Sequence, residues 1–164
     1  MSALRLVAVL VLAVVAAVSL VVSPASAQDR ETPYWATLRF DKVNLRVGPS
    51  REYRIDWVYQ RKGLPVKVVR IREGWRLVED AEGTMGWISE SQLSRSRGAL
   101  IVGEGLADMR EGPDPASGLR WRAEPGVVGQ LQRCRDNWCE IDVAGRTGWV
   151  FADRLWGDEE PAGG

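Results

Sequence analysis

The sequence predicts an all-β protein made of two tandem small antiparallel barrels, and three observations carry this prediction. The chain after residue 30 matches itself at an offset of 62 to 64 residues. Its apolar and β-branched residues form short runs, separated by turn signals about ten residues apart. No stretch in this part of the chain shows the 3.6-residue apolar period of an amphipathic helix.

Residues 1–27 have the features of a secretory signal peptide. Arg5 charges a short N-terminus, an apolar run extends over Leu6–Val22, and Ala25 with Ala27 forms a small-x-small cleavage pattern. We predict cleavage after Ala27, a periplasmic or secreted protein, and no stable membrane anchor once the peptide is removed. The alternative is an uncleaved anchor, because the run is close to the roughly 20 residues that span a membrane.

The internal repeat is carried by rare residues that recur in register. Leu45-Arg46-Val47-Gly48-Pro49 matches Met109-Arg110-Glu111-Gly112-Pro113, and Gly86-Trp87-Ile88 matches Gly148-Trp149-Val150. Six of the eight tryptophans form three matched pairs, which are Trp57 with Trp121, Trp75 with Trp138 and Trp87 with Trp149. We place the first barrel at residues 36–95 and the second at residues 96–157. The acidic tail, residues 158–164, is expected to be disordered.

Within each copy the pattern predicts two hairpins. In the first copy, a strand over Pro65–Ile71 is followed by a turn at Glu73-Gly74 and a strand from Trp75, and a second turn lies at Glu82-Gly83. The matching turns of the second copy are Asp136-Asn137 and Ala144-Gly145. Gly74 and Asn137 are expected to supply the positive φ of the first turn. Helix is expected only as single turns near residues 89–92 and 152–154.

The opening and closing motifs of the repeat resemble a known family. Asn44-Leu45-Arg46 followed by Gly48-Pro49, together with the strand Gly86-Trp87-Ile88, resembles the bacterial SH3-like (SH3b) domain. The second copy is the poorer match, since Ala107-Asp108-Met109-Arg110 replaces Val43-Asn44-Leu45-Arg46. The resemblance implies a tandem SH3-like protein that serves as a binding or targeting module of the cell envelope. Such modules often act on peptidoglycan or its peptides, and the resemblance does not imply catalysis.

The two cysteines lie on either side of the Asp136-Asn137 turn. With these two residues as the loop, Cys134 faces Cys139 across the hairpin, where side chains are close enough for a disulfide. Export to an oxidising compartment also favours a disulfide. The alternative is a redox or metal pair, but the C-x4-C spacing is not the redox spacing and two sulfurs make a poor metal site.

Aromatic residues of the first copy are the candidate ligand-binding residues. Trp57 and Trp121 lie in the long segment after Gly-Pro, which the resemblance identifies as a large surface loop, whereas Trp87 and Trp149 are expected to be mainly structural. Flat rings supply contact area at low entropic cost, so an extended peptide or a sugar face is a plausible ligand. The candidate site residues are Arg46, Tyr53, Trp57, Tyr59 and, in the second copy, Trp121. The alternative is that these rings only anchor the loop.

Charge is divided unevenly between the two copies. Residues 36–97 hold 13 Lys and Arg against 8 Asp and Glu, a net charge of +5, while residues 98–164 hold 7 against 12, a net charge of −5. One interpretation is two solvated faces or mutual attraction of the barrels. The other is that cations of the first copy meet an anionic partner. The residues concerned are Arg46, Arg51, Arg54, Arg61 and Lys62.

Composition excludes several classes of function. The chain contains no histidine, which removes Ser-His-Asp and Cys-His nucleophile systems and any imidazole base. A net charge of zero argues against nucleic acid as the partner. We therefore expect no enzyme, no cofactor and no metal. The leading hypothesis is a non-catalytic envelope module that recognises peptidoglycan or an extended peptide, and the alternative is an interaction or inhibitor protein that docks on another exported protein.

Overall fold

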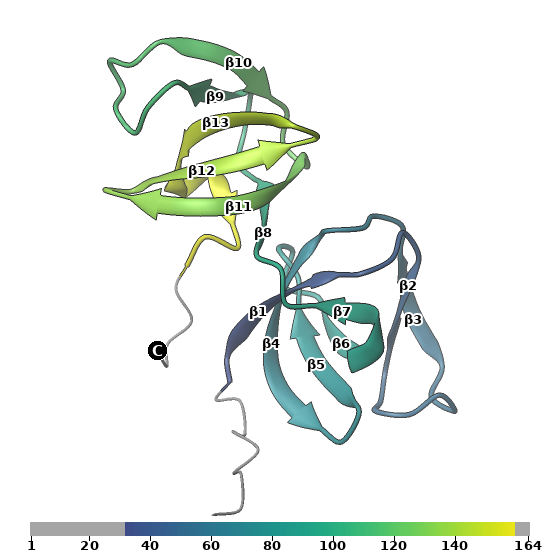
Figure 1. The fold of residues 1–164 in the computed structure, drawn as a ribbon. Coiled ribbons are helices and arrows are strands. Elements are labelled where there is room, and N and C mark those ends of the chain that lie inside the picture. The colour runs from purple at the N-terminus through teal and green to yellow at the C-terminus, as the bar shows by residue number, and fades with distance from the viewer. Residues whose placement is uncertain (1–31, 160–164) are drawn as a thin grey trace, which may run out of the picture. The chain divides into compact units, whose positions relative to one another are not determined.

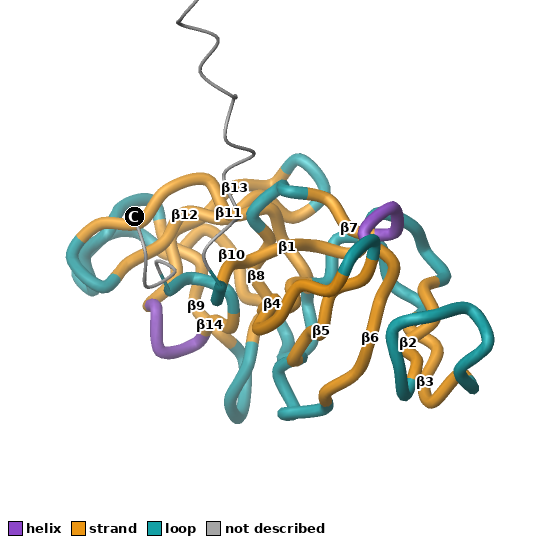
Figure 2. The backbone as a smooth tube through the Cα atoms, turned by 90° about the horizontal axis from the view of Figure 1, so that it is seen from below, coloured by secondary structure: helices purple, strands orange, loops and turns teal. Residues whose placement is uncertain are grey.

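The computed structural model describes residues 32–159. The predicted signal peptide and residues 160–164 of the tail lie outside the described residues. Within residues 32–159, no helix is long and apolar enough to cross a membrane. The described chain is all-β, as predicted, and the two short helical turns stand out in Figure 2.

The first barrel is one antiparallel sheet of seven strands in the order β3-β2-β6-β5-β4-β1-β7 (Figure 1). Its elements are β1 Tyr34–Leu38, β2 Val43–Arg46, β3 Ile55–Tyr59, β4 Pro65–Arg72, β5 Trp75–Glu79, β6 Met85–Ser89, the 3-10 turn η1 Glu90–Gln92 and β7 Leu93–Ser94. Strand β1 pairs with β4 on one side and with β7 on the other. It begins two residues before the boundary that the repeat predicts.

The second barrel repeats this topology, with the strand order β10-β9-β13-β12-β11-β8-β14. Its elements are β8 Gly98–Ile101, β9 Ala107–Arg110, β10 Leu119–Ala123, β11 Val128–Arg135, β12 Trp138–Val143, β13 Arg146–Phe151, the 3-10 turn η2 Ala152–Arg154 and β14 Leu155–Trp156. The two sheets have the same order of matched strands, so the sequence repeat corresponds to a repeat of structure.

Each barrel encloses its own apolar core. In the first, β-branched and leucine side chains from alternate strand positions meet, and Val43, Leu45 and Ile88 are fully buried. In the second, Met109 and Ile141 are fully buried. The closing-strand glycines are required by this packing, because a Cβ on Gly86 would lie 2.5 Å from Leu45 Cγ.

The hairpin turns confirm the predicted positions but differ in one detail of backbone conformation. Asp136 and Asn137 have positive φ values of 51° and 64°, as a two-residue hairpin turn requires. In the first barrel the positive φ, 49°, belongs to Glu73, and Gly74 is not among the glycines with positive φ. The expectation that Gly74 supplies it was therefore wrong.

The disulfide between Cys134 and Cys139 is formed, as predicted. The two residues pair directly across β11 and β12, one step from the turn. Neither cysteine of the chain is a free thiol.

Candidate functional site

Arg46 and Tyr53 are brought together at the loop between β2 and β3. The Arg46 guanidinium donates a hydrogen bond of 2.6 Å to the Tyr53 carbonyl oxygen, which ties the end of β2 to the loop. The Tyr53 ring covers Gly48, where a Cβ would lie 2.5 Å from the ring, yet Tyr53 remains 49% exposed. This pair presents a ring and a cation on the surface of the first barrel.

Trp57 lies on an edge strand and not in a loop, which corrects the sequence-based placement. The run Ile55–Tyr59 pairs with β2 to form β3, because its aromatic and β-branched residues suit a strand. Trp57 pairs with Leu45 in this ladder, yet at the sheet edge its side chain is 60% exposed. It remains accessible to a partner, as the sequence analysis expected.

Tyr59 follows Trp57 by two residues, so both side chains lie on the same face of β3. Unlike Trp57, Tyr59 is 6% exposed and packs in the core, so a ligand cannot stack on its ring as the sequence analysis envisaged. Both residues nevertheless line a cavity of about 270 Å³, which Asp80, Glu82 and others also line.

The phenol of Tyr59 is held by Asp80. It donates a hydrogen bond of 2.7 Å to Oδ2 of Asp80, whose Oδ1 accepts from the backbone N–H groups of Glu82 at 3.0 Å and Thr84 at 2.9 Å. Burial, followed by the hydrogen bond to Asp80 and the charges of Asp80 and Glu82, raises the pKa of Tyr59 well above its ordinary value. The phenol is therefore a neutral donor that fixes a carboxylate at the wall of the cavity.

The matching residue of the second barrel, Trp121, has different surroundings. It lies on β10, is partly buried and packs against the core. The guanidinium of Arg146 lies over its ring, 4.8 Å from the centroid. Nearby, Asp108 forms ion pairs of 2.9 Å with Arg122 and with Arg110, and these contacts, that of Arg122 first, lower the pKa of Asp108. The cations beside Trp121 and Asp108 thus have partners within the second barrel.

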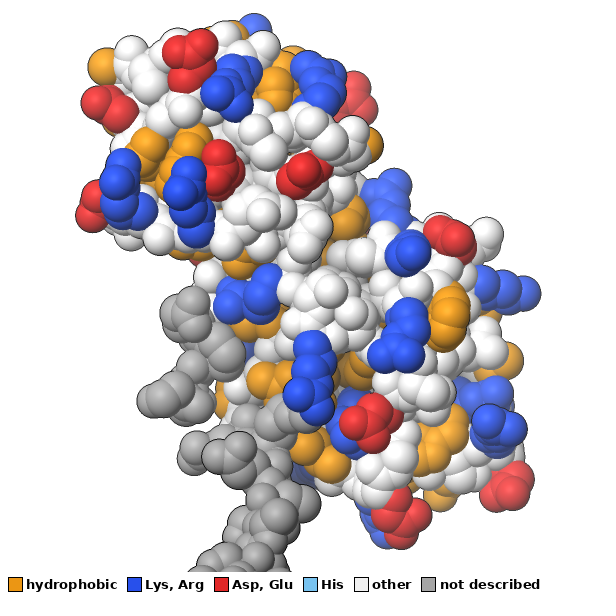
Figure 3. Space-filling model, in the orientation of Figure 1, with side chains coloured by type: hydrophobic (Ala, Val, Ile, Leu, Met, Phe, Trp, Pro, Cys, Tyr) orange, Lys and Arg blue, Asp and Glu red, His pale blue; other side chains and the backbone are white. Residues whose placement is uncertain are grey.

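The cations singled out in the first barrel do not form one patch. Arg54 pairs with Asp56 at 2.8 Å, Arg46 is bonded to a loop carbonyl, and Arg61 donates to the Gly126 carbonyl oxygen. Lys62 lines a larger cavity of about 670 Å³. On the face drawn in Figure 3, Lys and Arg side chains are scattered over the first barrel with acidic side chains among them.

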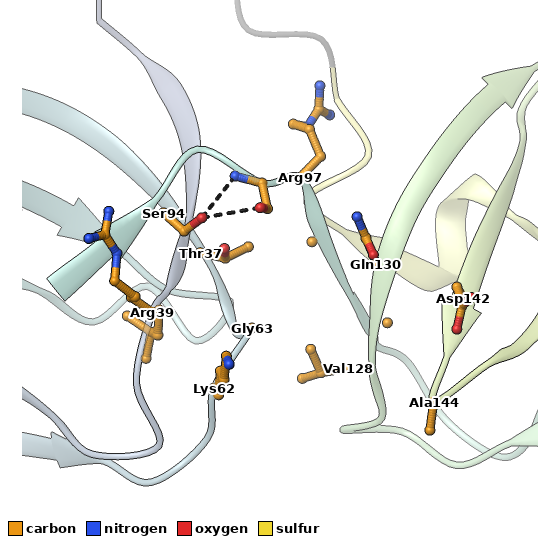
Figure 4. Close-up of a pocket in the computed structure, with 14 residues that line it drawn as sticks. Thr37, Arg39, Lys62, Gly63, Ser94, Arg97, Val128, Gln130, Asp142 and Ala144 are labelled. Atoms are coloured by element: carbon orange, nitrogen blue, oxygen red, sulfur yellow. Dashed lines mark hydrogen bonds between the residues drawn. The ribbon is translucent and has the colours of Figure 1, made fainter.

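The larger cavity has charged residues on its walls (Figure 4). Arg39 and Lys62 lie on one side of the view and Asp142 lies on the other. Asp142 already accepts a hydrogen bond of 2.6 Å from the Gly145 N–H, within its own turn. With Arg97, which also lines it, the cavity therefore combines three cationic residues with a carboxylate that serves the fold.

Sequence reasoning missed Asp80, Glu82 and Thr84 as residues of the site beside Trp57. Their signal was present in the repeat, because the loop over residues 81–83 is one residue longer than its counterpart and carries the glutamate. That they meet Trp57 depends on the closing of the barrel, which spacing along the chain does not reveal. Within residues 32–159, no group of three or more Cys, Asp or Glu is arranged to hold a metal ion.

Comparison with known proteins gives a family and a set of weak structural likenesses. The model of the bacterial SH3 domain matches residues 40–95 and 103–157. None of the curated proteins matches the chain significantly. Among solved structures, the chain is similar to NlpC2 of Trichomonas vaginalis, with 16% identity, 77% of this chain and 49% of that chain covered, and a TM-score of 0.35.

Two further solved structures are similar to the chain at the same level. NlpC1 of Trichomonas vaginalis has 15% identity, with 79% of this chain and 47% of that chain covered and a TM-score of 0.35. An NlpC/P60 family protein of Bacillus cereus has 13% identity, 76% and 57% coverage and a TM-score of 0.33. The chain spans about half the length of these solved chains. Because the family model matches most of the chain, once in each barrel, the protein belongs to the bacterial SH3 domain family.

Proposed function

We propose that the protein is a non-catalytic binding module of the cell envelope, and that its first barrel recognises peptidoglycan or an extended peptide. Bacterial SH3 domains are typically binding modules without catalysis, which supports the general role. The observation that carries the choice of barrel is the exposed ring of Trp57 beside a cavity.

The exposed apolar side chains of the first barrel support a contact surface there. Several large residues of this barrel are half exposed, namely Phe40, Tyr53, Ile55, Trp57 and Met85. Aromatic rings give large contact areas with little loss of rotamer entropy, and for this reason they are frequent at hot spots of interfaces. The acidic second barrel, with its cations engaged internally, is then the supporting unit.

The location that we propose is the periplasm or the exterior of the cell. The apolar N-terminal run with its Ala25-x-Ala27 pattern supports export. The disulfide between Cys134 and Cys139 is compatible with it, because disulfides persist in oxidising compartments.

Sedimentation with insoluble peptidoglycan tests the proposed function. The purified protein is mixed with peptidoglycan at increasing concentration, and the soluble fraction is measured after centrifugation. Saturable depletion is expected. A protein that stays in solution at every concentration would contradict peptidoglycan as the ligand, and recovery of a defined exported protein in crosslinking from intact cells would then support the alternative of protein docking.

A further inference from the structure

The matched tryptophans Trp57 and Trp121 have different neighbours in the two barrels. In the second barrel, Arg146 lies over the ring of Trp121, with its guanidinium carbon 4.8 Å from the centroid. In the first barrel the residue that corresponds to Arg146 is Thr84, from the match of Gly83-Thr84 with Gly145-Arg146. Thr84 lines the same cavity as Trp57, whose ring is 60% exposed. The first barrel therefore leaves open the place that an arginine fills in the second.

Carboxylates near the matched tryptophan are present in the first barrel and absent at the corresponding positions of the second. By strand register Asp80 corresponds to Val143, because Glu79 pairs with Met85 and Asp142 pairs with Thr147. Glu82 corresponds to Ala144, from the match of Glu82-Gly83 with Ala144-Gly145, so the second barrel has no carboxylate at either position. The barrel that lacks the cation is thus the one that has the carboxylates.

The two carboxylates of the first barrel have different roles. Asp80 is 8% exposed and accepts three hydrogen bonds, from the Tyr59 phenol and two backbone N–H groups, so its charge is fixed in place. Glu82 is exposed, and its carboxylate forms no ion pair with any of the residues 32–159. Glu82 is therefore the group available to a charged ligand, and Asp80 adds a second negative charge at the wall.

The cavity has the size and the surfaces that a planar cation requires. Its volume of about 270 Å³ far exceeds the share of one water molecule, about 30 Å³. One wall is an indole ring, whose face attracts cations, and a guanidinium stacks on such a ring while its N–H groups bond to a carboxylate. A Lys ammonium lacks this planar fork and is more strongly hydrated.

We propose that the cavity lined by Trp57, Glu82 and Thr84 binds the guanidinium group of an arginine side chain on a peptide partner. The proposal rests on the proposed function in one respect, that the first barrel is a binding barrel, and it names the chemical group that this barrel takes. The second barrel carries its own copy of that group in Arg146, which explains why the two copies have unequal roles.

The test is an NMR titration of the 15N-labelled protein with acetyl-Gly-Arg-Gly-amide. The indole N–H resonance of Trp57, assigned by its loss in W57F, is expected to shift saturably with peptide concentration. The same peptide with citrulline in place of arginine, which has the same shape without the charge, is expected to give no shift. An equal response to the citrulline peptide would overturn the proposal.

Position 84 provides the matched variants. T84R gives the first barrel its own guanidinium, as in the second barrel, and should weaken binding of the arginine peptide by about tenfold or more, which is about 1.4 kcal/mol. T84Q, which adds bulk without charge, should leave the affinity within about threefold of the parent, and E82Q should weaken binding, since it removes the available carboxylate. Unchanged affinity in T84R with a native spectrum would contradict the proposal.

Three further outcomes separate this inference from others. A lysine peptide that binds more tightly than the arginine peptide would overturn the guanidinium and assign an ammonium ligand. If the protein sediments with peptidoglycan but its Trp57 indole N–H resonance does not shift when the arginine peptide is added, this inference alone is contradicted. A protein that binds the peptide and does not sediment would contradict peptidoglycan as the ligand and leave this inference supported.

Discussion

At the scale of single residues, the two copies stabilise one position of the hairpin by different chemistry. The ladder pair Cys134–Cys139 of the second barrel corresponds to Ile71–Arg76 in the first. Arg76 is 7% exposed, donates to the Tyr34 hydroxyl at 3.0 Å and forms an ion pair of 2.8 Å with Glu90. A buried guanidinium with its partners thus ties the first-barrel hairpin to β1 and to η1, where the second barrel uses a covalent bond within its hairpin.

This contact predicts that Arg76→Ala strongly destabilises the protein. The substitution removes a buried cation and its hydrogen bonds, and the expected loss in the free energy of unfolding is about 3 kcal/mol. Urea unfolding followed by circular dichroism measures it. Arg70→Ala, at an exposed position of the neighbouring strand β4, is the control and should change stability by less than about 0.5 kcal/mol. Equal effects of the two variants would refute the role given to Arg76.

The phenol of Tyr59 predicts a loss of stability in alkali. Its folded-state pKa is raised by burial and by Asp80, whereas in the unfolded chain it titrates near 10. Above that pH the unfolded state loses a proton that the folded state keeps, so the free energy of unfolding falls by about 1.4 kcal/mol per pH unit. In Tyr59→Phe this part of the pH dependence should vanish, as measured by urea unfolding between pH 9 and about 11. An identical slope in the two proteins would contradict the assignment.

At the scale of elements, the hairpins could be predicted from local sequence signals. The features that the sequence analysis did not predict depend on contacts between residues distant in sequence. The β4–β5 and β11–β12 hairpins, both 3-10 turns and the disulfide were predictable, because turn residues and alternation act within a few residues. The predicted first barrel begins two residues after the start of β1, because the N-terminal end of this strand is defined by its pairing with β4. Trp57 was placed in a loop because the resemblance assigns the segment after Gly-Pro to a surface loop, whereas the run Ile55–Tyr59 pairs with β2.

The site shows the same division between local and distant information. The exposed ring of Trp57 was anticipated from its place in the repeat, but the buried position of Tyr59 was not. Its hydrogen bond to Asp80 joins residues 21 positions apart and depends on the closed barrel. Candidate site residues could thus be chosen by type from the sequence, whereas their grouping required the fold.

The disulfide predicts a modest and measurable contribution to the stability of the second barrel. A bond that closes a loop of about six residues stabilises a fold by about 2 kcal/mol in the chain-entropy estimate. Cys134→Ala combined with Cys139→Ala should therefore lower the free energy of unfolding by about this amount without loss of the fold, because the first barrel folds without such a bond. Complete unfolding of the double variant at room temperature would contradict this.

At the scale of the whole molecule, the two tryptophans outside the repeat contact each other. Trp35 on β1 and Trp156 on β14 pack edge to face, with ring centroids 5.1 Å apart. Arg97 donates to the carbonyl oxygens of residues 157, 158 and 159. Arg97 thus contacts the backbone of Asp158 and Glu159, the first two residues of the acidic tail. The repeat pattern could not reveal the contact of the two rings, since the first-barrel position that matches Trp156 is Ser94.

The central claim is that the first barrel carries the ligand-binding surface, and Trp57→Ala tests it most directly. In peptidoglycan sedimentation the variant should bind at least about 1 to 2 kcal/mol more weakly than the parent, as expected for an interface hot spot. Its circular dichroism spectrum and melting temperature should stay nearly unchanged, because the ring is 60% exposed. Trp121→Ala is the matched variant in the second barrel and should leave binding intact. Binding that survives Trp57→Ala, or that is lost in Trp121→Ala instead, would contradict the account, as would unfolding of the Trp57 variant, which would make the ring part of the core.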